Sequence, residues 1–388
     1  MEIQKKPVPG YLPTLDGWRA IAIAMVLLNH DKVHLVFGHP LQWLHENGAR
    51  GVWLFFALSG ILICSRLLQE ERLRGRLDLR GFYIRRVCRI QPAALTYLAV
   101  ISLLMLFHVL QSTPREVLYS VLLVRNYFPL HSPLNTWYTA HYWSLSVEEH
   151  FYLLLPGFLV LVSKRRARIL ISLLIAIELW RHFVFKYSFL RFGDVVGAHT
   201  DIAIDGILMG ALVAILLTKP SVKEWCVRWL HPWIVYIVTI AIWILLEFFP
   251  LVPLSNALLL GTFPLLIIST MLHPNTVSGK ILEHPALRFV GRISYSLYLW
   301  QMLFFVYNKP VPPPHSTLLL RVEGAPWRYL ALFAVSVLSY YVIEKPLMRL
   351  GHKLAKPATR GRGDLEDPAD PPSAPTQNLP QKEQVSVV

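Results

Sequence analysis

Residues 15–30 read LDGWRAIAIAMVLLNH, an apolar run that begins with Asp-Gly-Trp-Arg and ends in Asn-His. A plain membrane anchor has no use for polar groups at both ends, because polar groups inside a span are costly and normally face a cavity or a partner. Arg19 and His30 lie about three helical turns plus roughly 20° apart, so they share one helix face and are separated by ~16 Å along the axis. Asp16 lies one turn before Arg19. The alternative is that Arg19 reaches the membrane surface and His30 only links two helices by a hydrogen bond.

The composition of the whole chain indicates a membrane protein. Of 388 residues, 54% are hydrophobic and 16% are charged, whereas soluble domains carry about 25% charged residues. Apolar runs of bilayer length recur along the chain. We therefore predict an all-α, polytopic membrane protein with about ten transmembrane helices. The expected spans are 15–35, 49–68, 92–112, 143–163, 168–187, 201–217, 231–249, 254–272, 289–307 and 328–345, with the shorter stretch 115–128 as an interfacial or re-entrant helix.

The distribution of lysine and arginine predicts the orientation. With the N-terminus in the cytoplasm, the inside segments carry 28 of the 38 Lys and Arg residues. The positive-inside rule therefore favours both termini on the cytoplasmic side of an inner (cytoplasmic) membrane. Loop charges of this kind account for the net charge of +14 without a nucleic-acid partner. From about Lys353 the chain is rich in proline and charge, which is typical of disorder. We assign residues 1–350 to a membrane domain and residues 351–388 to a disordered cytoplasmic tail.

The stretch FYIRRVCRIQP, residues 82–92, places three arginines at the cytoplasmic start of the third span. Arg86 and Arg89 are i,i+3 neighbours and Arg85 and Arg89 are i,i+4 neighbours, so their like charges repel. Such a group favours an anion, and the guanidinium fork suits phosphate. The alternative is a stop-transfer signal or a patch for membrane lipid headgroups.

The stretch WSLSVEEHFYLLLP, residues 143–156, carries acidic side chains into the fourth span from the outer side. Ser144, Glu148 and Tyr152 fall on one helix face at i,i+4 spacing. A carboxylate inside a span is a candidate site by default. The adjacent Glu149 and His150 could suggest a metal, but no second spaced ligand pair follows, so we expect no metal site.

Two later stretches are less informative alone. VGRISYSLYLWQ, residues 290–301, begins a span with Ser294 and Tyr295, which by themselves fit packing or capping. YYVIEKPLMRLG, residues 340–351, contains Glu344 before a proline and by itself fits a helix end.

Taken together, the five stretches resemble the acyltransferase-3 family of membrane O-acyltransferases. That family opens with Arg or Lys and, after ten intervening residues, His. It has Arg-x-x-Arg at the third span, then blocks like WSLSVEEQFY and GKISYSLYLWH, and a closing IE-x-P. Here the blocks follow in the same order over residues 15 to about 350. The matching residues are Arg19, His30, Arg86, Arg89, Glu148, Glu344 and Pro346.

The chain also departs from the family pattern. His150 stands where the family commonly has Gln, and Gln301 stands for a common His, which argues against a catalytic role at position 301. The family's RFDALxxGALLA becomes AIDGILMGALVA, which keeps Asp205 and Gly210 but loses the arginine.

The resemblance implies an enzyme that moves an acyl group, in the simplest case acetyl, from cytoplasmic acyl-coenzyme A to a hydroxyl of a carbohydrate or a sugar-bearing lipid. Arg86 and Arg89, with Arg19, would hold the donor, and His30 would be the general base. Glu148 would orient His30, pair with it or contact the acceptor, and an acyl-histidine intermediate stays open. The residues expected to bind substrate or support the site are Asp16, Ser144, Tyr152, Asp205, Ser294, Tyr295 and Glu344.

Other functions fit parts of the pattern. Buried His, Glu and Arg could form the path of a transporter or of a lipid or polysaccharide flippase, although no internal repeat is visible. A scaffold or receptor without catalysis is a third class. Some members of the resembled family carry a fused extracytoplasmic hydrolase-like domain; we expect none here, and the chain would act alone or pass its product to a separate envelope protein.

Overall fold

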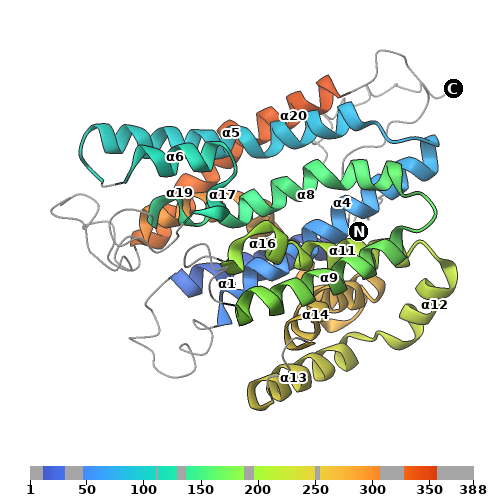
Figure 1. Cartoon of the computed structure of the whole chain (residues 1–388). Helices are drawn as coiled ribbons and strands as arrows, with labels where there is room; N and C mark the ends of the chain where they lie inside the picture. Colours follow the sequence, from blue (N-terminus) through green and yellow to red (C-terminus); the bar gives the residue numbers. More distant parts are fainter. Residues whose placement is uncertain are drawn as a thin grey trace, which may run out of the picture.

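Figure 1 shows the computed structural model, in which the long helices lie roughly side by side in a bundle. The structure describes residues 12–30, 47–110, 112–128, 137–187, 196–249, 254–305 and 327–355. All regular secondary structure in these ranges is helical, which confirms the predicted all-α class. The predicted tail, residues 351–388, lies outside the described residues from position 356 onward.

The helices of the first half are, in chain order, α1 (Pro13–His30), α4 (Arg50–Arg74), α5 (Leu79–Leu106), α6 (Pro114–Val121), η1 (Arg125–Tyr127), α7 (Trp137–Ala140), α8 (Tyr142–Leu161) and α9 (Arg166–Lys186). Those of the second half are η3 (Val196–Ala198), α10 (Thr200–Ala203), α11 (Asp205–Leu216), α12 (Pro220–Trp229), α13 (Pro232–Phe248), α14 (Leu254–Leu272), α15 (Val277–Leu282), α16 (Pro285–Arg292), α17 (Ser294–Phe304), α19 (Trp327–Ser339), η5 (Tyr340–Glu344) and α20 (Lys345–Leu354).

The predicted count of ten spans is not confirmed. Within the described ranges, five helices are long and apolar enough to cross a membrane, or six if the bent pair Thr200–Leu216 and Pro220–Trp229 is one span. That pair turns by 108° between its two helices. The predicted span 289–307 is divided between α16 and α17. Helix α1 is not among these five, because the polar residues at both of its ends lower its mean hydropathy. The short stretch 115–128 forms α6 and η1.

Two helices at the centre of the bundle, α4 and α11, touch backbone to backbone. A β-carbon added at Gly60 would collide with the carbonyl oxygen of Ile207, and one added at Gly210 would collide with that of Ala57. Gly206 and Gly210 have the small-xxx-small spacing that allows membrane helices to approach closely. This contact fixes α4, which carries one wall of the cavity described below.

Helix α1 is held at its N-terminal end in the same way. A β-carbon on Gly291 of α16 would overlap the carbonyl oxygen of Asp16. The Trp18 indole donates a hydrogen bond of 2.8 Å to the Thr270 hydroxyl of α14. These contacts place Asp16 and Arg19 at the end of α1 that packs against α14 and α16.

The predicted orientation in the membrane can be tested by cysteine labelling. Cys64 and Cys226 are buried and Cys88 is half-buried, so a Cys88→Ser chain is a suitable background for new cysteines. Arg76 and Arg115 are both exposed and lie at opposite ends of α5 and its flanking turns. We expect Arg115→Cys, but not Arg76→Cys, to react with a membrane-impermeant maleimide in intact cells, and both to react after lysis. Labelling of Arg76→Cys in intact cells would contradict the predicted orientation and would place the proposed donor side outside the cell.

Candidate active site

A cavity opens between α1, α4, α5, α8, the α16–α17 pair and η5. It encloses about 1100 Å³ of empty space, part of it open to solvent. Its lining brings together ten of the twelve residues that the sequence singles out, although they come from segments up to 328 positions apart. Those ten are Asp16, Arg19, Arg86, Arg89, Ser144, Glu148, Tyr152, Ser294, Tyr295 and Glu344. His30 and Asp205 do not line it.

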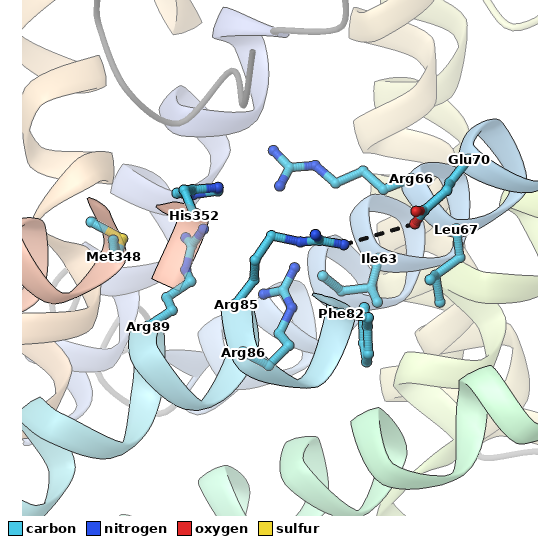
Figure 2. A pocket seen from close by; sticks show the side chains of 10 residues that line it. All are labelled: Ile63, Arg66, Leu67, Glu70, Phe82, Arg85, Arg86, Arg89, Met348 and His352. Carbon is cyan, nitrogen blue, oxygen red and sulfur yellow. Dashed lines mark ion pairs between the residues drawn. The ribbon is translucent and has the colours of Figure 1, made fainter. Parts of the chain in front are cut away.

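A second, strongly cationic hollow adjoins this cavity, and Figure 2 shows its arginines converging from α4 and α5. It encloses about 520 Å³ and is lined by Arg66, Arg85 and His352, together with Arg86 and Arg89, which line the larger cavity too. The acidic Glu70 lies at the rim, 3.8 Å from Arg85 (Figure 2). The two hollows therefore share a boundary made of arginine side chains.

The cationic hollow lies at the N-terminal end of α5. Asp78 caps this helix, and its carboxylate accepts a 2.9 Å hydrogen bond from the Gly81 backbone N–H. Arg85, Arg86 and Arg89 follow within the next three turns. The hollow therefore owes its positive charge to these side chains, which favour an anion. Arg86 also lies 5.2 Å from the Tyr152 ring centroid, which fixes its direction toward the cavity.

Glu148 reaches into the cavity from α8, and it is held there by neutral donors. The Ser59 hydroxyl of α4 donates a hydrogen bond of 2.5 Å to Oε1 of Glu148. The Tyr152 hydroxyl donates to Ser59 in turn, at 3.2 Å. Arg19, Arg86 and Arg89 all act on the Glu148 carboxylate electrostatically. Three cationic side chains thus act on a carboxylate that itself lines the cavity.

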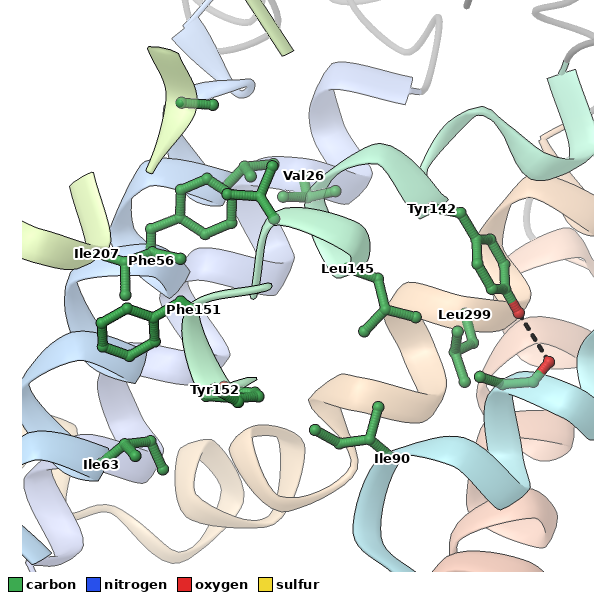
Figure 3. Packing of buried hydrophobic residues seen from close by; sticks show 14 of the residues in the cluster. Val26, Phe56, Ile63, Ile90, Tyr142, Leu145, Phe151, Tyr152, Ile207 and Leu299 are labelled. Atoms are coloured by element: carbon green, nitrogen blue, oxygen red, sulfur yellow. Dashed lines mark hydrogen bonds between the residues drawn. The ribbon is translucent and has the colours of Figure 1, made fainter. Parts of the chain in front are cut away.

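Apolar side chains beside this polar face anchor α8 in the core. Figure 3 shows Phe151 packed beside Phe56 of α4 and Ile207 of α11, and these three side chains are almost fully buried. At the start of α8 the Tyr142 hydroxyl donates to the Ala94 carbonyl of α5 at 2.7 Å (Figure 3). Because the apolar face is locked against three neighbouring helices, the face that carries Ser144, Glu148 and Tyr152 points into the cavity, as the i,i+4 spacing predicts.

Glu344 enters the cavity wall through an irregular turn. Residues 340–344 form the π-helix η5, and the chain continues without a stop into α20 through Pro346. The short stretch therefore does not end the helix, contrary to the expectation from Pro346 alone. Ser296 of α17 donates a hydrogen bond to the buried Glu344 carboxylate. Wide turns of this kind concentrate at functional sites, and here the wide turn coincides with a carboxylate in the cavity wall.

His30 lies at the last residue of α1, outside the cavity. Its Nδ1 atom is 3.1 Å from Oε1 of Gln301, and its ring packs edge-on to Trp137 with centroids 6.2 Å apart. Gln301 is one turn beyond Tyr298 on α17, and the Tyr298 side chain does line the cavity. Sequence reasoning dismissed position 301, yet the structure places this side chain against the predicted base. The substitution of Gln for the family's His was the signal available.

Asp205 belongs to a different cluster. Arg181 of α9 makes an ion pair with the Asp205 carboxylate and a second one, at 2.6 Å, with Glu178. Asp205 is 1% exposed, so the pairing offsets the cost of burying its charge. The arginine that the family places two residues before this aspartate is absent, and Arg181 supplies the positive charge from another helix.

The other departure, His150, is also explained by its partners. Its Nδ1 atom lies 2.7 Å from the Thr200 hydroxyl, and the Leu123 backbone takes part in a second hydrogen bond. A glutamine has one donor and one acceptor group for the same two partners, so His150 serves as a structural replacement. Among the described residues, no three His, Cys, Asp or Glu side chains gather as metal ligands.

Comparison with known proteins assigns the family. The model of the acyltransferase-3 family, described as "Acyltransferase domain", matches residues 12–345, and the chain belongs to this family. Residues 12–345 therefore form an acyltransferase domain of this family, with several helices of membrane-spanning length.

Individual relatives are O-acetyltransferases by name. A Staphylococcus aureus protein provisionally named an O-acetyltransferase is 29% identical over 371 residues, which cover 88% of this chain and 58% of the relative. The peptidoglycan O-acetyltransferase OatA of Listeria monocytogenes is 27% identical over 373 residues, with 88% and 56% covered. The chain thus spans a little over half the length of these curated relatives. No solved structure matches it.

Proposed function

We propose that this acyltransferase takes an acyl group, in the simplest case acetyl, from cytoplasmic acyl-coenzyme A and transfers it to a hydroxyl of a carbohydrate or sugar-bearing lipid of the cell envelope. The observation that carries the proposal is the joined pair of hollows. One is cationic and suits a phosphorylated donor; the other is polar and lined by the motif residues of the family.

The donor fits the two hollows in one direction. Coenzyme A carries several phosphates on its nucleotide half, and Arg66, Arg85 and His352 offer charge-assisted hydrogen bonds at the cationic hollow. Arg86 and Arg89 line the same hollow and would bind the phosphates with them, and the uncharged thioester arm would extend from there into the larger cavity. Arg19 lines that cavity too.

The transfer requires a base and a path for the proton. The acceptor hydroxyl oxygen attacks the thioester carbonyl carbon while His30 takes the hydroxyl proton; the C–S bond then breaks and the sulfur leaves as coenzyme A thiolate, which the proton finally neutralises. Because His30 lies beyond Tyr298, the acyl end of the donor would pass this ring to reach it. Glu148 lies on the donor's path and would orient the arm or the acceptor.

The acceptor class comes from the relatives. OatA is named a peptidoglycan O-acetyltransferase, and we extend an envelope carbohydrate acceptor to this chain.

Acyl-coenzyme A turnover separates this function from a transporter or flippase, for which the polar cavity could also serve as a path. Purified protein in lipid nanodiscs would be incubated with acetyl-coenzyme A carrying label in the acetyl group, together with peptidoglycan fragments or envelope glycolipid in parallel reactions. We expect free coenzyme A to appear in step with labelled acceptor in one of them. Absence of coenzyme A release with every acceptor, together with movement of a labelled glycolipid across the bilayer, would establish the transport function instead.

A further inference from the structure

Gln301 is a polar neighbour of the predicted base, and a second contact determines the orientation of its amide. Its side chain is fully buried, at 0% exposure. The amide nitrogen Nε2 donates to the Tyr298 carbonyl oxygen at 3.1 Å, and the amide oxygen Oε1 lies 3.1 Å from Nδ1 of His30. A carbonyl oxygen only accepts, so the amide nitrogen has to face Tyr298, and the amide oxygen then faces the imidazole.

This orientation selects the form of the imidazole. The Gln301 oxygen is an acceptor, so the Nδ1 atom of His30 has to carry a proton and donate it in the hydrogen bond. In neutral histidine the lone pair is then on Nε2, the nitrogen that can take a proton. A histidine at position 301, which is common in the family, could donate or accept and would leave the choice open. A glutamine side chain does not titrate. It also cannot turn its amide nitrogen toward His30 without losing the hydrogen bond to the Tyr298 carbonyl.

We propose that Gln301 is a positioning residue that holds His30 as the Nδ1-protonated tautomer, with Nε2 as the basic atom. The inference rests on the proposed function, because it concerns how the base of that reaction is prepared. It assigns a role to a residue that does not line the cavity and that the family pattern treats as a loss. The fixed hydrogen bond replaces, in this chain, the second imidazole of the family.

The test compares the pH dependence of kcat/KM in purified protein for two variants. Gln301→Met keeps the volume but removes the acceptor, so kcat should fall roughly 10- to 100-fold, the range for a metal-binding histidine that loses the partner orienting its ring. The KM for acetyl-coenzyme A should stay within about twofold. Gln301→Glu places a carboxylate at Nδ1 and favours the protonated ring, so the acid limb of the profile should move up by about 1 pH unit. Met302→Leu, at a buried neighbour on α17, is the matched control and should leave the limb in place.

A purely structural glutamine would lower the amount of folded protein without moving the acid limb. Normal turnover in Gln301→Met together with an unmoved limb in Gln301→Glu overturns the inference; if His30→Gln is inactive in the same assay, the proposed function nevertheless stands. Normal turnover in His30→Gln overturns the inference and the assignment of His30 as the base, whereas the proposed acyl transfer stands, because transfer is then observed with the base elsewhere.

Discussion

His30→Gln is expected to lower acyl transfer by at least ~10²-fold, the lower end of the effect of removing a general base. The substituted amide keeps a hydrogen-bonding group beside Gln301 and Trp137 but does not take a proton at neutral pH. The protein should fold, since one side chain at the end of α1 is exchanged for another of similar polarity. Donor binding should stay close to that of the unmodified protein, because Arg19 at the donor side lies ~16 Å away along the helix.

The measurement is single-turnover acetyl transfer at saturating acetyl-coenzyme A, with donor affinity determined separately by titration. His182→Gln, at an exposed position of α9, is the matched control and should transfer at the normal rate. A His30→Gln variant with near-normal turnover would make His30 a structural residue. Glu148, which lies in the cavity, would then be the next candidate for the base.

Arg86→Ala and Arg89→Ala are expected to weaken acetyl-coenzyme A binding about 10- to 150-fold each, since a hydrogen bond to a charged group contributes about 1.5–3 kcal/mol. Turnover at saturating donor should change less than affinity, because these residues bind a part of the donor that does not react. Arg89→Lys should restore affinity only in part, because an ammonium group lacks the bidentate fork. Arg86→Lys should be the poorer replacement of the two, since Arg86 also stacks over Tyr152.

Isothermal titration of the purified variants would give these affinities. Arg228→Ala, on α12 and outside both hollows, removes an equivalent charge and should leave the affinity unchanged. Unaltered donor binding in both Arg86→Ala and Arg89→Ala would return the arginines to the alternative of a stop-transfer signal or a lipid headgroup patch.

The sequence predicts the residues of the cavity better than it predicts the membrane spans. Polar side chains inside apolar runs are costly, so each one found there points to a cavity or a partner, and ten of them converge. Spans are harder, because the length of an apolar run does not reveal a break within it. The division at Ile293 between α16 and α17 and the 108° bend before α12 both occur inside or beside runs that look continuous in sequence.

Two site residues show what sequence patterns miss. His30 shares a helix face with Arg19, yet only Arg19 lines the cavity, together with Tyr298 of α17. A helical wheel of α1 alone contains no information about how α17 packs against it. Gln301 looked like a lost functional group because its value depends on a contact 271 positions away in the chain. In both cases the missing information is the packing of a distant helix.

The Arg181–Asp205 pair carries a further consequence. In the family pattern both charges belong to one short stretch, so either helix could be exchanged between members without separating them. Here the cation travels with α9 and the anion with α11. Grafting the α10–α11 segment of a typical member onto this chain would set two guanidinium groups against one carboxylate, whereas a grafted α9 without Arg181 would leave the Asp205 carboxylate without this ion pair. The two helices therefore have to be exchanged together.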